Sequence, residues 1–535
     1  MKKYCVSLIA LLLALCLVFP VPAQAQGALE LLTDLFSQFN QDTAPVIPYS
    51  EMEYVRPDLE QLQSLLDEVC RRAEGEDVSH ILDGVFEFYD AYDWFFTASA
   101  LAQIRYSADL TDSYWEEENN FCTVNTPAVQ QMLEQLNAAL SESPCREKLE
   151  KRFFGDGFFD GYGAESFWDD ELVTLMERES QLVSQYYTQY RQMTSFLGSL
   201  FFRPTHLAQT LVELIQVRNQ IAACMGCDSY EAFANDFYYY RDYDPEDMAA
   251  YLEGIRETLV PLYYQAWEQV NALEDCEPDW AMDYLRQAAQ AMGGTIQESF
   301  QRMEEGGLYD NDVGPHRFNS SFEVYLTSYQ EPFLFLSSTG TTYDALDIAH
   351  EFGHFCNDDA SWGSIVGMDV SEIFSQGMEY LTLCCHPEAQ ELLRYKMADS
   401  LSTYVEQACY ARFEQEMYQL TEPSVDALCG LYEQIFEEYG LVDEYFSPWD
   451  FVTTPHFYTS PMYVFSYIVS NDAALQLYQM ECDEPGQGLR LYQRSLDTQQ
   501  SYFLAFLEEA GLESPFAPGR LEEVAETFRQ FFAAA

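Results

Sequence analysis

Apolar residues recur three or four positions apart along most of the chain, which is the period of an amphipathic α-helix. The spacing appears in four long segments: residues 58–72, 81–105, 129–140 and 171–196. Asp244 followed by Pro245 predicts a further helix start, with the aspartate as N-cap and the proline at the first helical position. The pattern therefore predicts a mostly α protein.

Residues 318–338 (FNSSFEVYLTSYQEPFLFLSS) break this helical pattern. They are rich in β-formers and alternate in part, which predicts one or two strands with a turn near Gln330-Glu331-Pro332. We expect a small β-sheet beside the helix that follows. An exposed strand there could pair with an extended peptide through main-chain hydrogen bonds.

The N-terminus has the pattern of a secretory signal peptide. Lys2 and Lys3 precede an apolar run over residues 6–19, and Ala23-Gln24-Ala25 provides an Ala-x-Ala cleavage site. The apolar run is shorter than the roughly 20 residues that a membrane span needs. We therefore predict a signal peptide over residues 1–25, cleavage after Ala25, and a secreted or cell-surface protein.

Composition narrows the classes of partner. A chain of 535 residues with 48% hydrophobic residues can bury a large core and form two or more lobes. Its formal net charge of −63 argues against nucleic acid and anionic membranes as binding partners, because both are negatively charged. No later segment is apolar enough to predict an integral membrane span. Cys224-Met225-Gly226-Cys227 is a lone CxxC, for which buried structural thiols are the favoured interpretation.

His350-Glu351-Phe352-Gly353-His354 is an HExxH motif. On a helix, residues four apart lie one turn above each other on one face, so the two imidazoles can bind a single Zn²⁺ ion. Glu351 lies beside them and is predicted to act as general base on zinc-bound water. A chance match is disfavoured, because the whole chain has only seven histidines.

A third ligand has to come from further along the chain. The residues after His354 lack the glycine and the third histidine of the longer HExxHxxGxxH motif. Glu372 and Glu379 are seven apart, so they share one helical face. Glu372 is the predicted third ligand, and Glu379 is predicted to hydrogen-bond a ligand imidazole. Asp369 is the alternative ligand.

A second group of candidate residues lies late in the chain, where His456, Tyr458, Tyr463 and Tyr467 follow closely on one another. Peptide hydrolysis passes through a tetrahedral oxyanion, and a fixed imidazole or phenol can donate a hydrogen bond to it. All four side chains are candidates for that role or for substrate contact. Aromatic core packing is the alternative explanation of the cluster taken alone.

Together these segments resemble the M3 family of zinc metallopeptidases, and its oligoendopeptidase F branch more than thimet oligopeptidase. The likeness rests on HEFGH, on the E-x-x-S-x-x-x-E frame that starts at Glu372, and on the segment from His456 to Tyr467. It covers roughly residues 200–535. The resemblance implies two mostly helical lobes around a deep substrate channel, as in thimet oligopeptidase and neurolysin. We accordingly divide the chain into an N-terminal helical domain, residues 26–200, and a catalytic domain, residues 201–535.

The resemblance also implies roles for single residues. His350, His354 and Glu372 correspond to the ligands of one zinc ion per chain, and Glu351 corresponds to the base. The remaining implied roles are substrate or oxyanion donors at His456 and Tyr463.

The predicted function is a secreted zinc-dependent oligoendopeptidase that hydrolyses internal bonds of short peptides. Two alternatives stay open at this point. One is a non-catalytic peptide-binding protein that keeps the channel, although a binder would not need Glu351. The other is a zinc hydrolase of another gluzincin or aspzincin type, with Asp369 as a ligand.

Overall fold

Helices dominate the computed structural model, which describes residues 46–162, 170–194, 203–277, 279–363, 366–386 and 389–534. It is 71% helix and 3% strand, so the predicted mostly α fold with a small sheet is confirmed. The predicted signal peptide lies outside the described residues.

The chain divides into two compact units. Unit 1 holds the described residues within Met1–Ser180, Gln301–Ser337 and Asp358–Ile365. Unit 2 holds those within Gln181–Phe300, Ser338–Asn357 and Val366–Ala535. The predicted boundary at residue 200, and the channel between two lobes, stay predictions.

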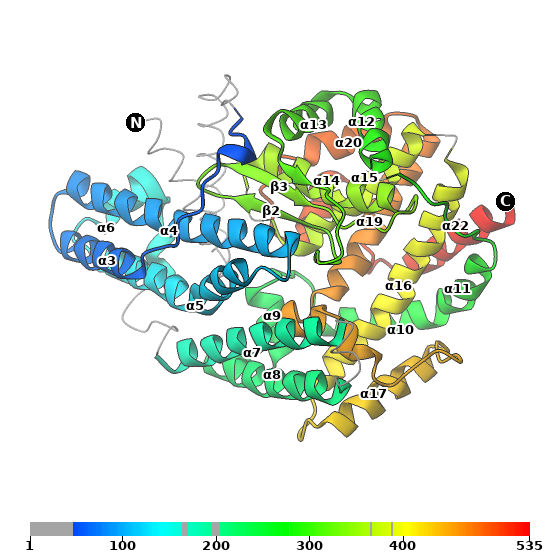
Figure 1. The fold of residues 1–535 in the computed structure, drawn as a ribbon, viewed down its shortest axis with the longest axis horizontal. Helices are drawn as coiled ribbons and strands as arrows, with labels where there is room; N and C mark the ends of the chain where they lie inside the picture. The colour runs from blue at the N-terminus through cyan, green and yellow to red at the C-terminus, as the bar shows by residue number, and fades with distance from the viewer. Residues whose placement is uncertain are drawn as a thin grey trace. The chain divides into compact units, whose positions relative to one another are not determined.

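Three long helices form most of the N-terminal part of unit 1, and a short one follows them (Figure 1). They are α3 (Leu59–Ala73), α4 (Val78–Ala108), α5 (Ser113–Ser141) and α6 (Arg146–Leu149). The carboxylates of Asp58, Asp77 and Asp112 cap the three long helices by accepting hydrogen bonds from backbone N–H groups of the first turn. The apolar faces of these helices meet in one core, to which Leu66, Phe88 and Leu136 belong, as their periodicity predicts.

The sheet of unit 1 has three strands in the order β1-β3-β2. They are β1 (Tyr309–Asp310), β2 (Phe322–Leu326) and β3 (Glu331–Phe335). β2 and β3 are antiparallel, with Val324 opposite Phe333, and β1 runs parallel to β3. The turn ends earlier than predicted, because Gln330 has a left-handed φ of 58° and Glu331 already lies in β3.

Unit 2 is helical throughout its described elements, and three further helices cross the division between the units. The crossing helices are α7 (Asp170–Thr194), α13 (Gly294–Gly306) and α14 (Asp344–Ser361). The helices of unit 2 are α8 (Pro204–Cys224), α9 (Tyr230–Phe237), α10 (Pro245–Thr258), α11 (Val260–Trp267), α12 (Trp280–Met292), α15 (Met368–Cys385), α16 (Gln390–Tyr418), α17 (Val425–Glu438), α18 (His456–Thr459), α19 (Val464–Asp483), α20 (Gln487–Ser495), α21 (Phe503–Ala510) and α22 (Arg520–Ala534). α10 starts as predicted, with Asp244 as N-cap and Pro245 as its first residue.

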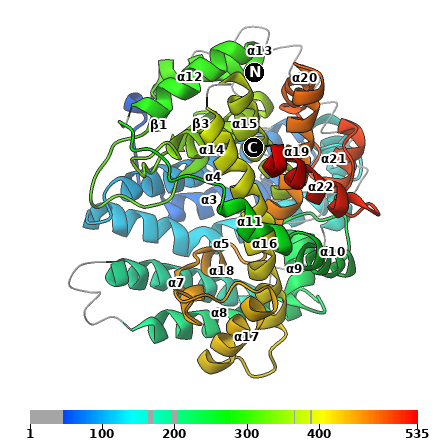
Figure 2. The same ribbon diagram turned by 90° about the vertical axis from the view of Figure 1, so that its right-hand side faces the viewer.

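Three helices form the centre of unit 2. α19 packs against both α15 and α16, and the two views show these three helices close together (Figures 1 and 2). α15 and α19 are buried along most of their lengths, polar residues included. Polar side chains this deep need partners, so these helices are where a chemical site is expected.

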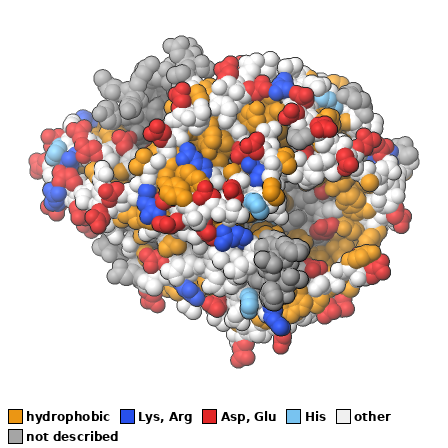
Figure 3. Space-filling view, viewed as in Figure 1, with side chains coloured by type: hydrophobic (Ala, Val, Ile, Leu, Met, Phe, Trp, Pro, Cys, Tyr) orange, Lys and Arg blue, Asp and Glu red, His pale blue; other side chains and the backbone are white. Residues whose placement is uncertain are grey.

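The described surface agrees with the strongly negative composition. Asp and Glu side chains are spread widely over the face in Figure 3. Within the described residues no helix is both long and apolar enough to cross a bilayer. Cys224 is exposed and Cys227 is half-buried, so the predicted burial of the CxxC pair is wrong for its first member.

Candidate metal centre

The HEFGH segment lies on α14, whose start is held by a carboxylate. Asp344 accepts hydrogen bonds from the Ser338 hydroxyl at 2.6 Å and from the backbone N–H groups of Thr339 and Gly340 at 2.7 and 3.1 Å. These bonds fix the turn that precedes the helix. Because both residues lie within this helix, His350 and His354 are one turn apart, with 5.2 Å between their ring centroids.

Gly353, inside the motif, allows α15 to approach α14 closely. A Cβ atom at this position would lie 2.4 Å from the carbonyl oxygen of Phe374 and 2.6 Å from Cα of Ser375. Because the obstacle would be backbone, neither helix could give way cheaply. The glycine therefore sets the distance between the two helices that carry the candidate ligands.

Glu372 of α15 reaches across to both imidazoles. Its Oε2 lies 3.4 Å from Nε2 of His350, and its Oε1 lies 3.7 Å from Nε2 of His354. One ligand atom from each of the three residues lies within 4.8 Å of the others. The structure thus brings together the two histidines and the glutamate that the sequence selects, and two nitrogens with one carboxylate match the donor chemistry of a catalytic zinc site.

The other nitrogen of each imidazole is held by an outer layer of side chains. Nδ1 of His350 hydrogen-bonds Oε1 of Glu379 at 2.9 Å, and Nδ1 of His354 hydrogen-bonds the Ser371 hydroxyl at 3.0 Å. Nζ of Lys396, on α16, lies 2.6 Å from the second oxygen of Glu379. With Nδ1 engaged, Nε2 of both rings is directed at Glu372, which is the orientation a metal-binding histidine needs.

Sequence reasoning selected Glu379 but missed Ser371, Lys396 and the role of Gly353. Ser371 is adjacent to Glu372, yet nothing in its type distinguishes it from other serines. Lys396 follows Glu379 by 17 residues on another helix, so its contact depends on how α16 packs. No sequence signal marks it, because Lys396 stands between Arg394 and Asp399 on a helix of mixed polarity, and only the structure shows that it is buried.

Charge around the imidazoles is strongly negative. Burial alone would lower the pKa of His350, but its hydrogen bond to Glu379 and the charges of Glu372, Glu379 and Glu351 raise it to about 10. The pKa of His354 falls to about 4, because burial and the neighbouring His350 outweigh the attraction of the carboxylates. The carboxylates around the two imidazoles therefore stabilise a positive charge at this place, and the same negative field would stabilise a bound cation.

Glu351 lies next to the candidate ligands on α14. Its side chain is almost fully buried, and burial together with nearby Asp347, Glu372 and Glu379 raises its pKa to about 8, against the opposing effect of His350. A carboxyl group with a pKa near neutrality is suited to take up and release a proton.

His456, Tyr463 and Tyr467 gather beside Glu372. The Tyr463 hydroxyl donates to Oε1 of Glu372, and Nε2 of His456 lies 3.3 Å from the Tyr467 hydroxyl. The ring centroid of Tyr463 is 5.6 Å from that of His456 and 5.1 Å from that of Tyr467. Three of the four predicted donors therefore share one place with the candidate ligands.

Tyr458 lies elsewhere. Its side chain is fully buried, and its ring stacks on Tyr186 of α7 with 4.1 Å between the centroids. This packing favours the core interpretation of Tyr458 over the predicted substrate contact. The helical turn of α18 separates it from His456, which faces the opposite way toward Tyr467.

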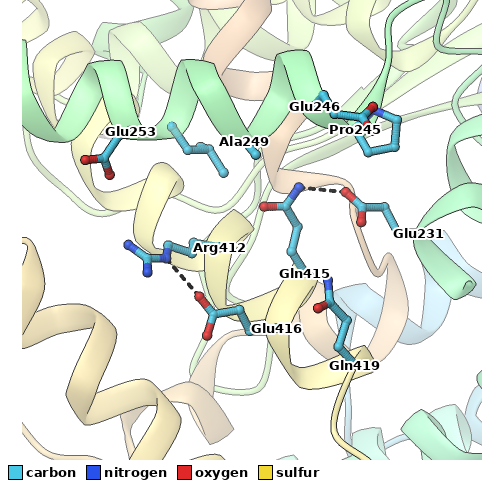
Figure 4. A pocket seen from close by; sticks show the side chains of 10 residues that line it. Glu231, Pro245, Glu246, Ala249, Glu253, Arg412, Gln415, Glu416 and Gln419 are labelled. Atoms are coloured by element: carbon cyan, nitrogen blue, oxygen red, sulfur yellow. Dashed lines mark hydrogen bonds and ion pairs between the residues drawn. The ribbon is translucent and has the colours of Figure 1, made fainter.

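A separate surface cavity of about 420 Å³ lies between α9, α10 and α16 (Figure 4). Gln415 donates to Glu231 at 2.6 Å across it, and Arg412 pairs with Glu416 at 2.9 Å. None of the three candidate ligands His350, His354 and Glu372 lines it, so it is distinct from the candidate metal centre. Its lining residues are Glu231, Pro245, Glu246, Ala249, Leu252, Glu253, Arg412, Gln415, Glu416 and Gln419.

Comparisons with known proteins bear on the family and on the fold. Residues 49–163 match the model of the Peptidase M3 N-terminal domain. A comparison with curated protein sequences gives no match. This family match lies outside the segments on which the sequence resemblance rests, so it is independent support for the same family.

Solved structures with the same fold include several oligoendopeptidases. A putative oligoendopeptidase F from Bacillus anthracis str. Ames is 21% identical, with a TM-score of 0.77 over 92% of this chain and 99% of that one. A second putative oligoendopeptidase F is 20% identical, with a TM-score of 0.79 over 91% and 99%. A structure of PZ peptidase A with inhibitor 2 is 18% identical, with a TM-score of 0.77 over 91% and 99%. At these identities the likeness establishes the shared fold.

Proposed function

We propose that this chain, whose M3 N-terminal domain and oligoendopeptidase F fold support a peptidase of the M3 family, is a secreted zinc-dependent oligoendopeptidase. Its substrates would be short peptides, cleaved at internal bonds. The observation that carries the proposal is the meeting of His350, His354 and Glu372 around one point, with Glu351 alongside.

The candidate ligands fit zinc both in the type of their donor atoms and in the hydrogen bonds that orient the two imidazoles. Nε2 of both histidines faces the Glu372 carboxylate, while Nδ1 of each ring is already hydrogen-bonded. A bound zinc ion would supply a Lewis acid that polarises the scissile carbonyl and makes the attacking water more acidic. Outer-layer contacts of this kind fix the tautomer and the ring orientation that binding needs.

The remaining chemistry belongs to side chains of this protein. Glu351 takes the proton of the attacking water and later delivers a proton to the leaving amine. His456 and Tyr463 are the proposed donors to the carbonyl oxygen as it gains negative charge, with Tyr467 held beside them. Tyr463 has a single O–H proton, which it donates to Glu372 here, so its hydroxyl would have to turn from Glu372 to the carbonyl oxygen when a peptide is bound. A buried phenol keeps its proton, because burial and the charge of Glu372 hold the pKa of Tyr463 well above its usual range.

Asp369 is the less favoured ligand. It is buried at the start of α15, where its Oδ2 accepts a 2.5 Å hydrogen bond from the Tyr243 hydroxyl and lies 3.5 Å from Nε of Arg241. A carboxylate already paired with an arginine is poorly placed to serve a metal. The aspzincin-type alternative therefore loses support, and Glu351 argues against a protein that only binds peptides.

Incubation with a mixed peptide library, read by mass spectrometry, tests the proposed activity. We expect cleavage at internal bonds that a chelator abolishes and that added Zn²⁺ restores. Glu351→Gln is the matched control, since it keeps the shape and the metal ligands but cannot accept the proton. Its kcat should fall about 100- to 10,000-fold.

Two results would contradict the proposal. Cleavage by the wild type at the level of Glu351→Gln would leave the peptide-binding alternative standing. Activity that survives complete removal of metal would exclude the zinc mechanism. The proposed export has its own test, namely N-terminal sequencing of the chain recovered outside the cell, which should begin at Gln26.

A further inference from the structure

The backbone between α18 and α19 has an unusual conformation at Met462. This residue has φ of 66°, in the left-handed region that non-glycine residues seldom adopt. Its side chain is buried, so the conformation is not that of a loose surface turn. Such a conformation persists only where the surroundings fix it, and it is common where the next residues have a function to perform. The next residue is Tyr463.

Two buried side chains hold the peptide groups of Met462. Its N–H donates to Oε1 of Glu414, on α16, at 2.8 Å. Its carbonyl oxygen accepts from Nη2 of Arg241 at 2.9 Å. The preceding carbonyl, that of Pro461, accepts from the Tyr239 hydroxyl at 2.7 Å. Ordinary turns do not have both polar groups of one residue held by ionisable side chains in the core.

Arg241 is itself fixed from several sides. Nη1 donates to Oδ1 of Asn235 at 2.8 Å, and Nη2 also donates to the Ser466 hydroxyl at 3.1 Å. Nε lies 3.5 Å from Oδ2 of Asp369. The guanidinium thus connects the first turn of α15, which leads to Glu372, with the first turn of α19, which carries Tyr467.

Glu414 has fewer hydrogen-bond partners than Arg241. Oε1 receives the Met462 N–H, whereas Oε2 is buried and has no hydrogen-bond partner among the described residues. A buried carboxyl group with one unsatisfied oxygen costs stability. The Met462 N–H and the charges of the buried Arg218 and Arg241 are the features that favour a glutamate over an apolar residue at this position.

We propose that Arg241 and Glu414 are positioning residues that lock the Met462 backbone and thereby keep the Tyr463 hydroxyl on Glu372. This inference rests on the proposed function, because Glu372 is a proposed zinc ligand. The chain of contacts is short: Arg241 and Glu414 hold Met462, Tyr463 follows it, and the Tyr463 hydroxyl donates to Glu372.

A double-mutant cycle between Glu414→Leu and Tyr463→Phe tests the inference. Each single variant should lower kcat about 10-fold with little change in KM, and should weaken Zn²⁺ binding about 10-fold in competition with a chromogenic chelator. In the Tyr463→Phe background, Glu414→Leu should change either quantity by less than about twofold. Glu414→Gln keeps an acceptor for the Met462 N–H and should restore both quantities to within about threefold of the wild type.

The outcomes separate the two proposals. Effects that multiply in the double variant would overturn the inference, since Glu414 would then act independently of Tyr463. A Glu414→Leu variant with wild-type kcat and wild-type Zn²⁺ affinity would overturn it as well. If the wild type cleaves no peptide, the proposed function fails, while the cycle in Zn²⁺ affinity still decides the inference. Should Glu414→Leu not fold, Arg241→Lys, which keeps the charge but loses the paired N–H donors, takes its place in the same cycle.

Discussion

Equally buried carboxyl groups in the two units can have opposite pKa shifts. Asp93 of α4 and Glu134 of α5, both in unit 1, are 7% and 5% exposed, and burial raises the pKa of each to about 8. Glu379 of unit 2 is also 5% exposed, yet its pKa is lowered. Burial pushes its pKa up as well, but Lys396 and His350 outweigh that effect.

The difference shows that the neighbours of a buried acid, and not its depth alone, set the direction of its pKa shift. Asp93 and Glu134 lie among apolar helix faces, where the neutral form is preferred and a proton is kept. Glu379 has a cation on one side and an imidazole on the other, so it keeps its charge at equal depth. Glu379 thus keeps its charge in the interior of unit 2, whereas burial raises the pKa of Glu351 in the same site, as it does for Asp93.

Among the variants that test this difference between the two units, Glu372→Gln should have the largest effect. Removing the carboxylate that faces both imidazoles should weaken Zn²⁺ binding about 100- to 1,000-fold and abolish peptide cleavage. Bound zinc measured after dialysis checks this. Asp93→Asn is the matched control, since it replaces an equally buried acid of unit 1 with its amide and should leave bound zinc unchanged. Asp369→Asn tests the alternative ligand by the same measurement of bound zinc. If Glu372→Gln binds as much zinc and cleaves peptides as fast as the wild type, the proposed ligand set is wrong.

Lys396→Met comes next in size. It leaves the Glu379 carboxylate buried without its cation, which typically costs about 3 kcal/mol or more of unfolding free energy. Chemical denaturation at neutral pH measures the loss. Lys396→Arg, which keeps the charge, should recover part of it. A Lys396→Met protein as stable as the wild type would show that Glu379 does not depend on this ion pair.

Asp93→Asn should have the smallest effect, visible only as a pH dependence. The native pKa of Asp93 is about 8, above its ordinary value of 3.8, so the folded state binds the proton more tightly. Its contribution to stability is therefore complete below about pH 4 and is lost as the pH rises toward 8. Relative to the wild type, Asp93→Asn should gain about 1–2 kcal/mol between pH 5 and pH 6. Calorimetric melting at both pH values checks this, and an unchanged difference would mean that Asp93 is ionised in the folded protein.

Some of this organisation could be predicted from the chain alone. The helices of unit 1 follow from apolar periodicity and from aspartates at their N-caps, both of which are local. α5 begins 16 residues before the predicted segment, because the part before that segment is mostly polar and ends near Pro127, features that the apolar period cannot detect. The Asp244-Pro245 start of α10 was predictable for the same local reason that the N-caps were.

The outer layer of the candidate site could not be predicted in this way. Lys396, Arg241 and Glu414 are far in sequence from the groups they contact, and their residue types are common on surfaces. Only the packing of α16 and of the segment before α10 shows that they are buried and paired. Tyr458 illustrates the converse, since its sequence neighbours suggested a donor while packing places it against Tyr186.

The sequence by itself determined the spacing of His350 and His354, because one turn of helix fixes the distance and the shared face. It also determined that Glu372 and Glu379 lie along one side of the next helix. Tertiary structure decided whether the two faces would meet. They meet because Gly353 lets α15 pack closely against α14. Lys396 of α16 then pairs with Glu379, and Arg241 binds the backbone of Met462 beside the site. Contacts between helices depend on the whole core, which no local pattern specifies.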